Sequence, residues 1–422
     1  MRSISLIVTT LLCLSASAVS AESLTLRECL AKASTGNYSL RVATHDEKIA
    51  AEGIGIARSG FLPRIDLQGG YTAQLEPQSI QFDGVSIATQ DADYPFLSLT
   101  IYQTIYDFGR TDSRYRRAQA AREATSYSYA GQEKEVFLQV VKAYFGILQD
   151  EKLQRAAEEE VTQMADHLRV AQNFYDQGVV TRNDLLQAEV RLATSRQRAL
   201  EEGNRLTNGW LSLNYLIGNP PEFRSTLEEG AAVAPATPPA DPEKAFAGRA
   251  EVNSLKKLIE GNDQEVRENR GNYYPEIYAQ MGLDYVKNGQ VKEQTIYAGT
   301  VGLKINLFDG LATTSRLRQA VETRSRSEEA LRQLQADIRL EYMTATNDAK
   351  VALERIKVAQ DSIRQGEENL RINKDRYQAQ VGTATDVIDA QTLLTQTKTE
   401  YFRALFDYQV AVARVKKSLG EL

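Results

Sequence analysis

The sequence predicts a mainly α-helical fold with a β-barrel portion, built from two tandem repeats. Two kinds of segment predict it: long proline-free tracts with apolar residues at three-four spacing, and short segments in which apolar and polar residues alternate. Both kinds occur twice, in the same order, which indicates a duplication. Each repeat is therefore expected to contain two β-strands and long coiled-coil helices.

The distribution of proline sets the helical tracts. All ten prolines lie within residues 63–95, 220–242 and 275. Because an interior proline costs a helix about 3 kcal/mol, residues 96–219 and 276–422 are free to form long helices. We expect helices near residues 37–59, 110–176, 182–217, 250–271, 310–379 and 384–419.

The last two helices each carry an apolar stripe typical of a coiled coil. The stripe of the final helix is Val387, Ala390, Leu394, Thr397, Tyr401, Ala404, Tyr408, Ala411 and Val415. That of the preceding helix is Ile338, Tyr342, Ala345, Ala349, Ala352, Ile356, Ala359 and Ile363. The first repeat has corresponding residues 202 positions earlier, so that Leu185 corresponds to Val387. The residues that correspond to the final stripe are apolar or glycine except at Ser195 and Glu202. Those that correspond to the preceding stripe begin as apolar residues, and polar residues appear at Asp150 and Gln154.

Four segments alternate with period two, as in Ile65, Leu67 and Gly69. We expect strands near residues 63–75, 95–107, 275–286 and 295–308. The loops at residues 76–94 and 287–294 join paired strands, so in a membrane barrel they should share one side, the outside. A soluble sandwich would show the same alternation. The aromatic residues at the strand ends favour a lipid-facing barrel; they include Tyr94, Phe96, Tyr106, Phe108, Tyr273, Tyr274, Tyr285 and Phe308.

The first 21 residues are typical of a secretory signal peptide. Arg2 precedes an apolar run at residues 4–14 and a small-residue stretch that ends at Ala21. No later apolar stretch approaches the roughly 20 residues of a membrane helix, so a membrane-inserted part is expected to consist of strands. We therefore expect a signal peptide (1–21), a first repeat (22–218), a linker or equatorial segment (219–242) and a second repeat (243–422).

Charge and composition argue against several classes of function. The net charge of -6 provides no basic surface for nucleic acid. His45 and His167 are the only histidines, and Cys29 is the only cysteine beyond the signal peptide. This leaves no Cys/His metal set, no cofactor motif and no catalytic constellation, so we expect neither an enzyme nor a bound metal.

The order of several short motifs, repeated twice, resembles the TolC family of outer-membrane efflux proteins over essentially the whole mature chain. The motifs are Leu24-Thr25-Leu26, Phe61-Leu62-Pro63, Tyr273-Tyr274-Pro275, the turns at residues 175–181 and 377–383, and the segment at residues 386–391.

This resemblance implies a homotrimer whose strands form a twelve-stranded outer-membrane barrel above an α-helical periplasmic tunnel. It also implies contact with outer-membrane lipid, a periplasmic adaptor (membrane fusion) protein and an inner-membrane transporter (RND, ABC or MFS type) in a Gram-negative cell. The strand count also favours a trimer. The four strands of one chain cannot close into a barrel in lipid, and the eight strands of two chains would form a barrel filled by side chains. The twelve strands of three chains form the smallest barrel expected to leave a conduit. The expected function is the passive exit duct of a tripartite efflux pump or type I secretion system; the alternative is a non-conducting periplasm-spanning scaffold or adhesin.

Two sets of site residues follow. The resemblance places adaptor contacts at the tip formed by the two helix turns, Gly178, Val179, Val180, Thr181, Val381, Gly382 and Thr383. It also implies a constriction made by Asp386 and Asp389, with Tyr377 bracing the closed state. Gly382 stands where the family has a bracing arginine, and Arg182 is the candidate substitute. Thr181 with Asp184 and Thr383 with Asp386 are also typical of helix N-caps, and capping explains Asp386 about as well as a constriction does.

Overall fold

The computed structural model describes residues 23–229 and 241–422, which form two compact units. The helical unit takes in the described residues of Met1–Asn37, Gln139–Ala234 and Ala349–Val410. The sheet unit takes in Tyr38–Leu138, the described residues of Pro235–Asp348, and Ala411–Leu422. The predicted signal peptide and residues 230–240 of the predicted linker lie outside the described residues.

The long helices begin and end close to the predicted residues. They are α3 (Arg110–Asp176), α4 (Arg182–Ile217), α7 (Ala312–Gln378) and α8 (Ala384–Ser418). A capped α1 (Leu26–Gly36) precedes them. The later parts of α3 and α7 belong to the helical unit together with α4 and most of α8. None of the helices in the described residues combines the length and apolar content of a membrane-crossing helix.

The predicted apolar stripes are the buried faces of these helices. Ile338, Ala345, Ala352 and Ala359 of α7 are buried, with half-buried residues between them. The small side chains let neighbouring helices approach closely. In α3, Asp150 remains on the buried face although it interrupts the apolar pattern.

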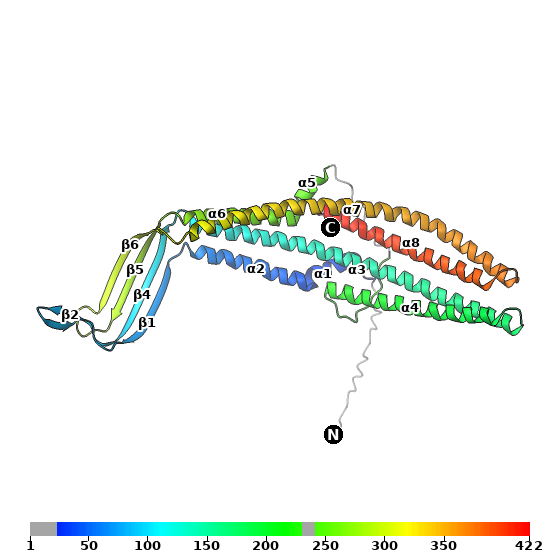
Figure 1. Cartoon of the computed structure of the whole chain (residues 1–422), viewed down its shortest axis with the longest axis horizontal. Helices are drawn as coiled ribbons and strands as arrows, with labels where there is room; N and C mark the ends of the chain where they lie inside the picture. The colour runs from blue at the N-terminus through cyan, green and yellow to red at the C-terminus, as the bar shows by residue number, and fades with distance from the viewer. Residues whose placement is uncertain (1–22, 230–240) are drawn as a thin grey trace, which may run out of the picture. The chain divides into compact units, whose positions relative to one another are not determined.

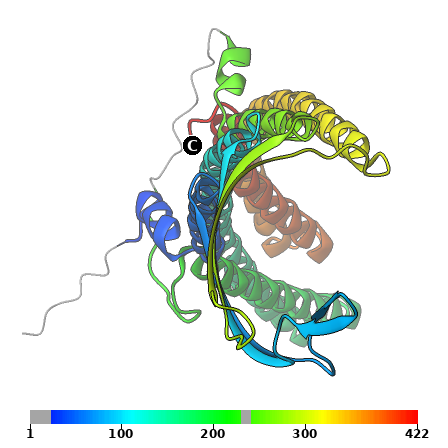
Figure 2. The same ribbon diagram turned by 90° about the vertical axis from the view of Figure 1, so that its left-hand side faces the viewer.

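The sheet unit contains a four-stranded antiparallel sheet in the order β1-β4-β5-β6 (Figure 1). The strands are β1 (Arg64–Ala73), β4 (Asp93–Tyr106), β5 (Glu276–Val286) and β6 (Thr295–Lys304). The last strand ends at Lys304 rather than near residue 308 as predicted. Figure 2 shows that the sheet is strongly curved. In the described residues β1 and β6 pair on one side only, so the sheet has two open edges.

The two faces of the sheet differ as the alternation predicts. One face carries Leu67, Met281 and Val301, which are all more than 60% exposed although they are apolar. The opposite face carries Gln68, Ser98 and Asp284, and Ser98 donates a hydrogen bond to Asp284 across the β4–β5 pair (2.5 Å). A broad exposed apolar face is what lipid would cover.

Two aromatic residues do not fit the predicted lipid-interface set. Phe96 pairs with Gly70 and Val286, and Tyr94 pairs with Thr72, so both rings lie on the polar face of the sheet. Tyr285 and Tyr106 pair with Leu97 and Ile277 and do lie on the apolar face. The aromatic residues at the strand ends are therefore divided between the two faces.

The segment predicted as a loop at residues 76–94 contains a further hairpin. Strands β2 (Ser79–Phe82) and β3 (Val85–Ala88) pair across an Asp83-Gly84 turn in which both residues have positive φ. This first loop is tied to the second one at residues 287–294. The Asp91 carboxylate accepts hydrogen bonds from Gly289 N (2.7 Å) and Gln290 Nε2 (3.2 Å).

Helices α2 (Tyr38–Ser59), α5 (Pro242–Ala247) and α6 (Ala250–Gly271) complete the sheet unit. Buried Arg249 forms ion pairs with Glu251 (2.7 Å) and Glu341 (2.9 Å), and Lys417 joins Glu341 (3.2 Å) to Glu135 (2.7 Å). These pairs connect α3, α6, α7 and the end of α8 within the sheet unit.

Candidate functional site

Two helix turns lie together at one end of the helical unit (Figure 1). One joins α3 to α4 and the other joins α7 to α8. The backbone hydrogen bonds of the two turns correspond after a shift of 202 residues. Val179 N donates to Phe174 O (2.8 Å), and Val381 N donates to Arg376 O (2.9 Å). The duplicated sequence therefore forms the same turn twice, once in each repeat.

A threonine and an aspartate cap the helix that follows each turn. The Asp184 carboxylate accepts from Thr181 N (2.9 Å), and the Asp386 carboxylate accepts from Thr383 N (2.9 Å). In return the threonine Oγ1 atoms accept from Asp184 N (3.3 Å) and Asp386 N (3.2 Å). The backbone hydrogen bond from Thr383 holds the pKa of Asp386 below its usual range. Both aspartates thus have a capping role.

Asp389 has no such role. It is exposed one turn further along α8 and makes no hydrogen bond or ion pair with any described residue. Asp386 and Asp389 are three residues apart on the exposed side of the helix, so both carboxylates face the same way. In the first repeat the residue that corresponds to Asp389 is Gln187, which carries no charge.

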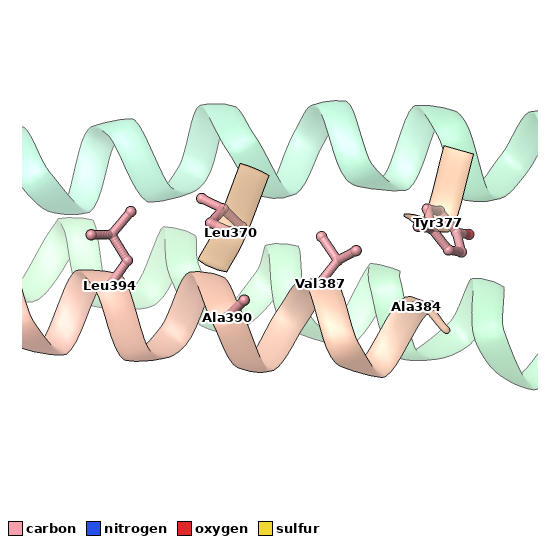
Figure 3. Packing of buried hydrophobic residues seen from close by; sticks show 6 residues of the cluster. All are labelled: Leu370, Tyr377, Ala384, Val387, Ala390 and Leu394. Carbon is pink, nitrogen blue, oxygen red and sulfur yellow. The ribbon is translucent and has the colours of Figure 1, made fainter. Parts of the chain in front are cut away.

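Behind the second turn lies a buried apolar cluster between α7 and α8. Figure 3 shows Val387 and Ala390 of α8 directed toward Leu370 and Tyr377 of α7. Tyr377 is only 5% exposed, and its hydroxyl has no hydrogen-bond partner among the described residues. Burial, and secondly the charge of Asp184, raises the pKa of Tyr377. The structure therefore brings the predicted bracing tyrosine close to Asp184 of the other repeat.

A histidine that sequence reasoning did not connect to this site packs against the same tyrosine. The ring of His167 on α3 lies 5.4 Å from that of Tyr377, and its Nε2 has no partner among the described residues. Burial, with the nearby Lys374 charge, lowers the pKa of His167. No sequence signal links residues of two different helices about 210 positions apart, so only the fold reveals this contact.

Arg182 is not part of this cluster. It is the first residue of α4, is exposed, and forms no ion pair with a described residue. A Cβ atom on Gly382 would lie 3.1 Å from Arg376 Cβ and 3.3 Å from Tyr377 N, so a side chain at the predicted arginine position would require these atoms to shift by a few tenths of an ångström. The corresponding residue of the first turn is Val180.

The turn residues are accessible. Val179 is 44% exposed and Val381 is 67% exposed. A groove of about 460 Å³ lies beside them between the first turns of α4 and α8, and its lining residues include Leu186, Val190 and Ile388. Two exposed apolar tips and a partly apolar groove thus occur at the same end of the helical unit.

Within the described residues, no cluster of three or more histidine, cysteine, aspartate or glutamate side chains could hold a metal ion. The arrangement instead combines a curved sheet whose apolar face is exposed, long paired helices, and two paired helix turns. These features define an outer-membrane channel subunit.

Comparisons with known proteins agree with this class. The chain belongs to the outer membrane efflux protein family, whose model matches residues 30–219 and 242–421. The outer membrane protein TolC of Vibrio cholerae is 23% identical over 422 residues, covering 96% of this chain and 92% of that protein. The alkaline protease secretion protein AprF of Pseudomonas aeruginosa is 23% identical over 348 residues, covering 79% of this chain and 71% of that protein.

Solved structures show the same fold. The outer-membrane channel OprN superposes with a TM-score of 0.82 at 17% identity, over 94% of this chain and 90% of that one. The outer membrane protein VceC of Vibrio cholerae superposes with a TM-score of 0.81 at 16% identity, over 94% of this chain and 96% of that one. The predicted two-repeat, mainly helical fold with strands is confirmed, and the chain is an outer-membrane protein of a Gram-negative cell that extends into the periplasm.

Proposed function

We propose that three copies of this chain form the passive exit duct of a tripartite efflux pump or a type I secretion system, and that the duct catalyses no reaction. The sheet carries the proposal. Its two open edges, on β1 and β6, cannot remain unpaired in lipid, and its apolar face is exposed. Pairing β1 of one copy with β6 of the next would give twelve strands around a polar lumen.

The two expected repeats, residues 22–218 and 243–422, would each contribute one helix turn and two strands to this assembly. The mass of the detergent-solubilised protein tests the stoichiometry: we expect a trimer, and a stable monomer or dimer would contradict the shared barrel. Ion conductance of the trimer in planar bilayers separates a duct from a scaffold or adhesin, because a scaffold would not conduct.

We further propose that the helix turns contact a periplasmic adaptor that connects the duct to an inner-membrane transporter. The exposed Val179 and Val381 and the adjacent groove support this role. A photo-crosslinker at Val381 should capture the adaptor. Val358 on α7 is a matched control, since it is 66% exposed but lies about six helical turns from the α7–α8 turn. Equal capture from both positions would contradict a docking site at the turns.

In this proposal Asp386 and Asp389 form the constriction of the tunnel. Three copies would present two rings of carboxylates, and like charges so placed bind cations. Because Asp386 is also engaged in capping, Asp389 is the more diagnostic residue. Replacing Asp389 with Asn should relieve cation block of the conductance more than replacing Asp184 with Asn. Equal relief from both variants, or none, would leave both repeats with capping aspartates only.

A further inference from the structure

Two aromatic side chains on the polar face of the sheet lie over glycines of the neighbouring strand. Phe96 of β4 is paired with Gly70 of β1, and Tyr278 of β5 is paired with Gly302 of β6. A Cβ atom on Gly70 would lie 2.6 Å from the Phe96 ring, and one on Gly302 would lie 2.5 Å from the Tyr278 ring. No Cβ atom can approach a ring so closely, so only glycine permits these ring positions.

The opposite side of each ring is also restricted. Tyr278 stacks on Tyr102 of β4, with ring centroids 5.5 Å apart and planes inclined by 22°. Tyr102 is itself held by a hydrogen bond from its hydroxyl to Glu276 (2.7 Å). A Tyr278 ring displaced from Gly302 therefore cannot turn toward β4 and must rise away from the sheet. For Phe96, the register places Val286 on the β5 side of the ring.

The two ring–glycine pairs lie at opposite ends of the sheet. Phe96 is three residues from the loop end of β4, and Tyr278 is the third residue of β5, at the end that follows α6. If the polar face lines the lumen, three copies place three Phe96 rings at an outer level and three Tyr278 rings at an inner level. A ring that lies flat against the wall leaves the lumen open, and a ring that stands up obstructs it.

We propose that Gly70 and Gly302 set the width of the duct, because they let Phe96 and Tyr278 lie flat on the lumen wall. This assignment rests on the proposed function, in which the polar face lines the lumen. It makes the two glycines determinants of the largest cargo that passes the barrel. The two levels act separately, since each ring has its own glycine.

Size-graded labelling tests the proposal. Single cysteines replace Gly282, which faces the lumen between the two levels, and Lys304, which lies beyond the Tyr278 level. Maleimide-polyethylene glycols of increasing length are added to intact cells, where they enter from the loop end. Buried Cys29 provides the background, measured in the protein without either new cysteine.

We expect Gly70→Val to lower the size limit for labelling at both cysteines, because Phe96 then obstructs the outer level. Gly302→Val should lower the limit at Lys304→Cys and leave Gly282→Cys unchanged. Gly299→Val is the matched control, since Gly299 lies on the opposite face with no atom within 4 Å of a Cβ placed there. Adding Phe96→Ala to Gly70→Val, or Tyr278→Ala to Gly302→Val, should restore the original limit.

Trimer assembly is checked for every variant, and Gly70→Ala and Gly302→Ala replace any valine variant that does not assemble. If both cysteines are labelled and the glycine variants leave the size limits unchanged, or the alanine substitutions fail to restore them, the width assignment is wrong. If neither cysteine reacts even with the smallest reagent, the polar face does not line a lumen and the proposed duct itself is wrong.

Discussion

The two helix turns have the same backbone but different side chains. Gly178 in the first turn and Gln380 in the second both have positive φ, 73° and 61° respectively. Arg182 is exposed at the start of α4, whereas the corresponding Ala384 of α8 is buried. The comparison shows that a duplicated chain can keep its turn geometry through hydrogen bonds and caps while the side chains diverge for different contacts.

The largest difference between the repeats that we expect to measure is at Asp150, which corresponds to Ala352. Burial raises the pKa of Asp150 to about 6, partly offset by the nearby Arg205. The folded chain therefore keeps a proton that the unfolded chain releases between about pH 4 and 6, and stability falls as the pH rises through that window. Asp150→Ala should increase the free energy of unfolding by about 1–3 kcal/mol at pH 8.

The same variant should gain little below pH 4, where the aspartate is protonated in both states. Denaturant unfolding, followed by circular dichroism at pH 4 and at pH 8, provides the measurement. The assembled protein is kept at one concentration throughout. An equal gain at pH 4 and pH 8 would mean that packing, rather than the buried carboxylate, distinguishes the two repeats at this position.

An exchange of the positive-φ residues tests the turn backbone. Gly178→Gln places a side chain in a left-handed conformation and should destabilise the protein by about 1–2 kcal/mol. Gln380→Gly relieves the same strain but makes the unfolded chain more flexible, so a gain of no more than about 1 kcal/mol is expected. Thermal unfolding of the two variants would show opposite shifts; shifts of the same sign would mean that the turns are not equivalent.

The caps should have modest and similar effects. Thr181→Ala and Thr383→Ala each remove the hydroxyl that accepts from the aspartate backbone N, and Thr181→Ala also removes the bond that Thr181 Oγ1 donates to the Asp184 carboxylate (2.8 Å). Each variant should cost about 1 kcal/mol. The corresponding serine variants, which keep the hydroxyl, serve as controls and should retain most of the stability. A clearly larger loss of stability for Thr383→Ala than for Thr181→Ala would show that the caps of the two turns are not equivalent.

The main elements of the fold were predictable from local signals. The predicted helix bounds match the structure for α3 and α4, which lie in a proline-free tract, and for α6. The β2–β3 hairpin was also predictable, since Asp83-Gly84 between short alternating segments is a hairpin signal. Part of the predicted linker beyond Asn219 is bound to the start of the chain, because Leu227 pairs with Leu24 in a parallel β-bridge. Its composition did not predict this pairing.

The candidate site was predictable only in part. The Thr-x-x-Asp spacing predicts both caps because those bonds are local. The contact of Tyr377 with His167 and the position of Phe96 over Gly70 depend on which helices and strands become neighbours and on side-chain rotamers. Pattern alone carries no information about either of these.

The pairing of β4 with β5 has a consequence for the order of synthesis and export. The first hairpin of the sheet, β1–β4, is complete at Tyr106, but its partner strand begins at Glu276. At a synthesis rate of about 5–20 residues per second, that strand follows roughly 10–30 s later. In a chain exported during its synthesis, the apolar hairpin would spend this interval without its neighbour and with unpaired edges, and a chaperone that binds extended apolar strands would protect it.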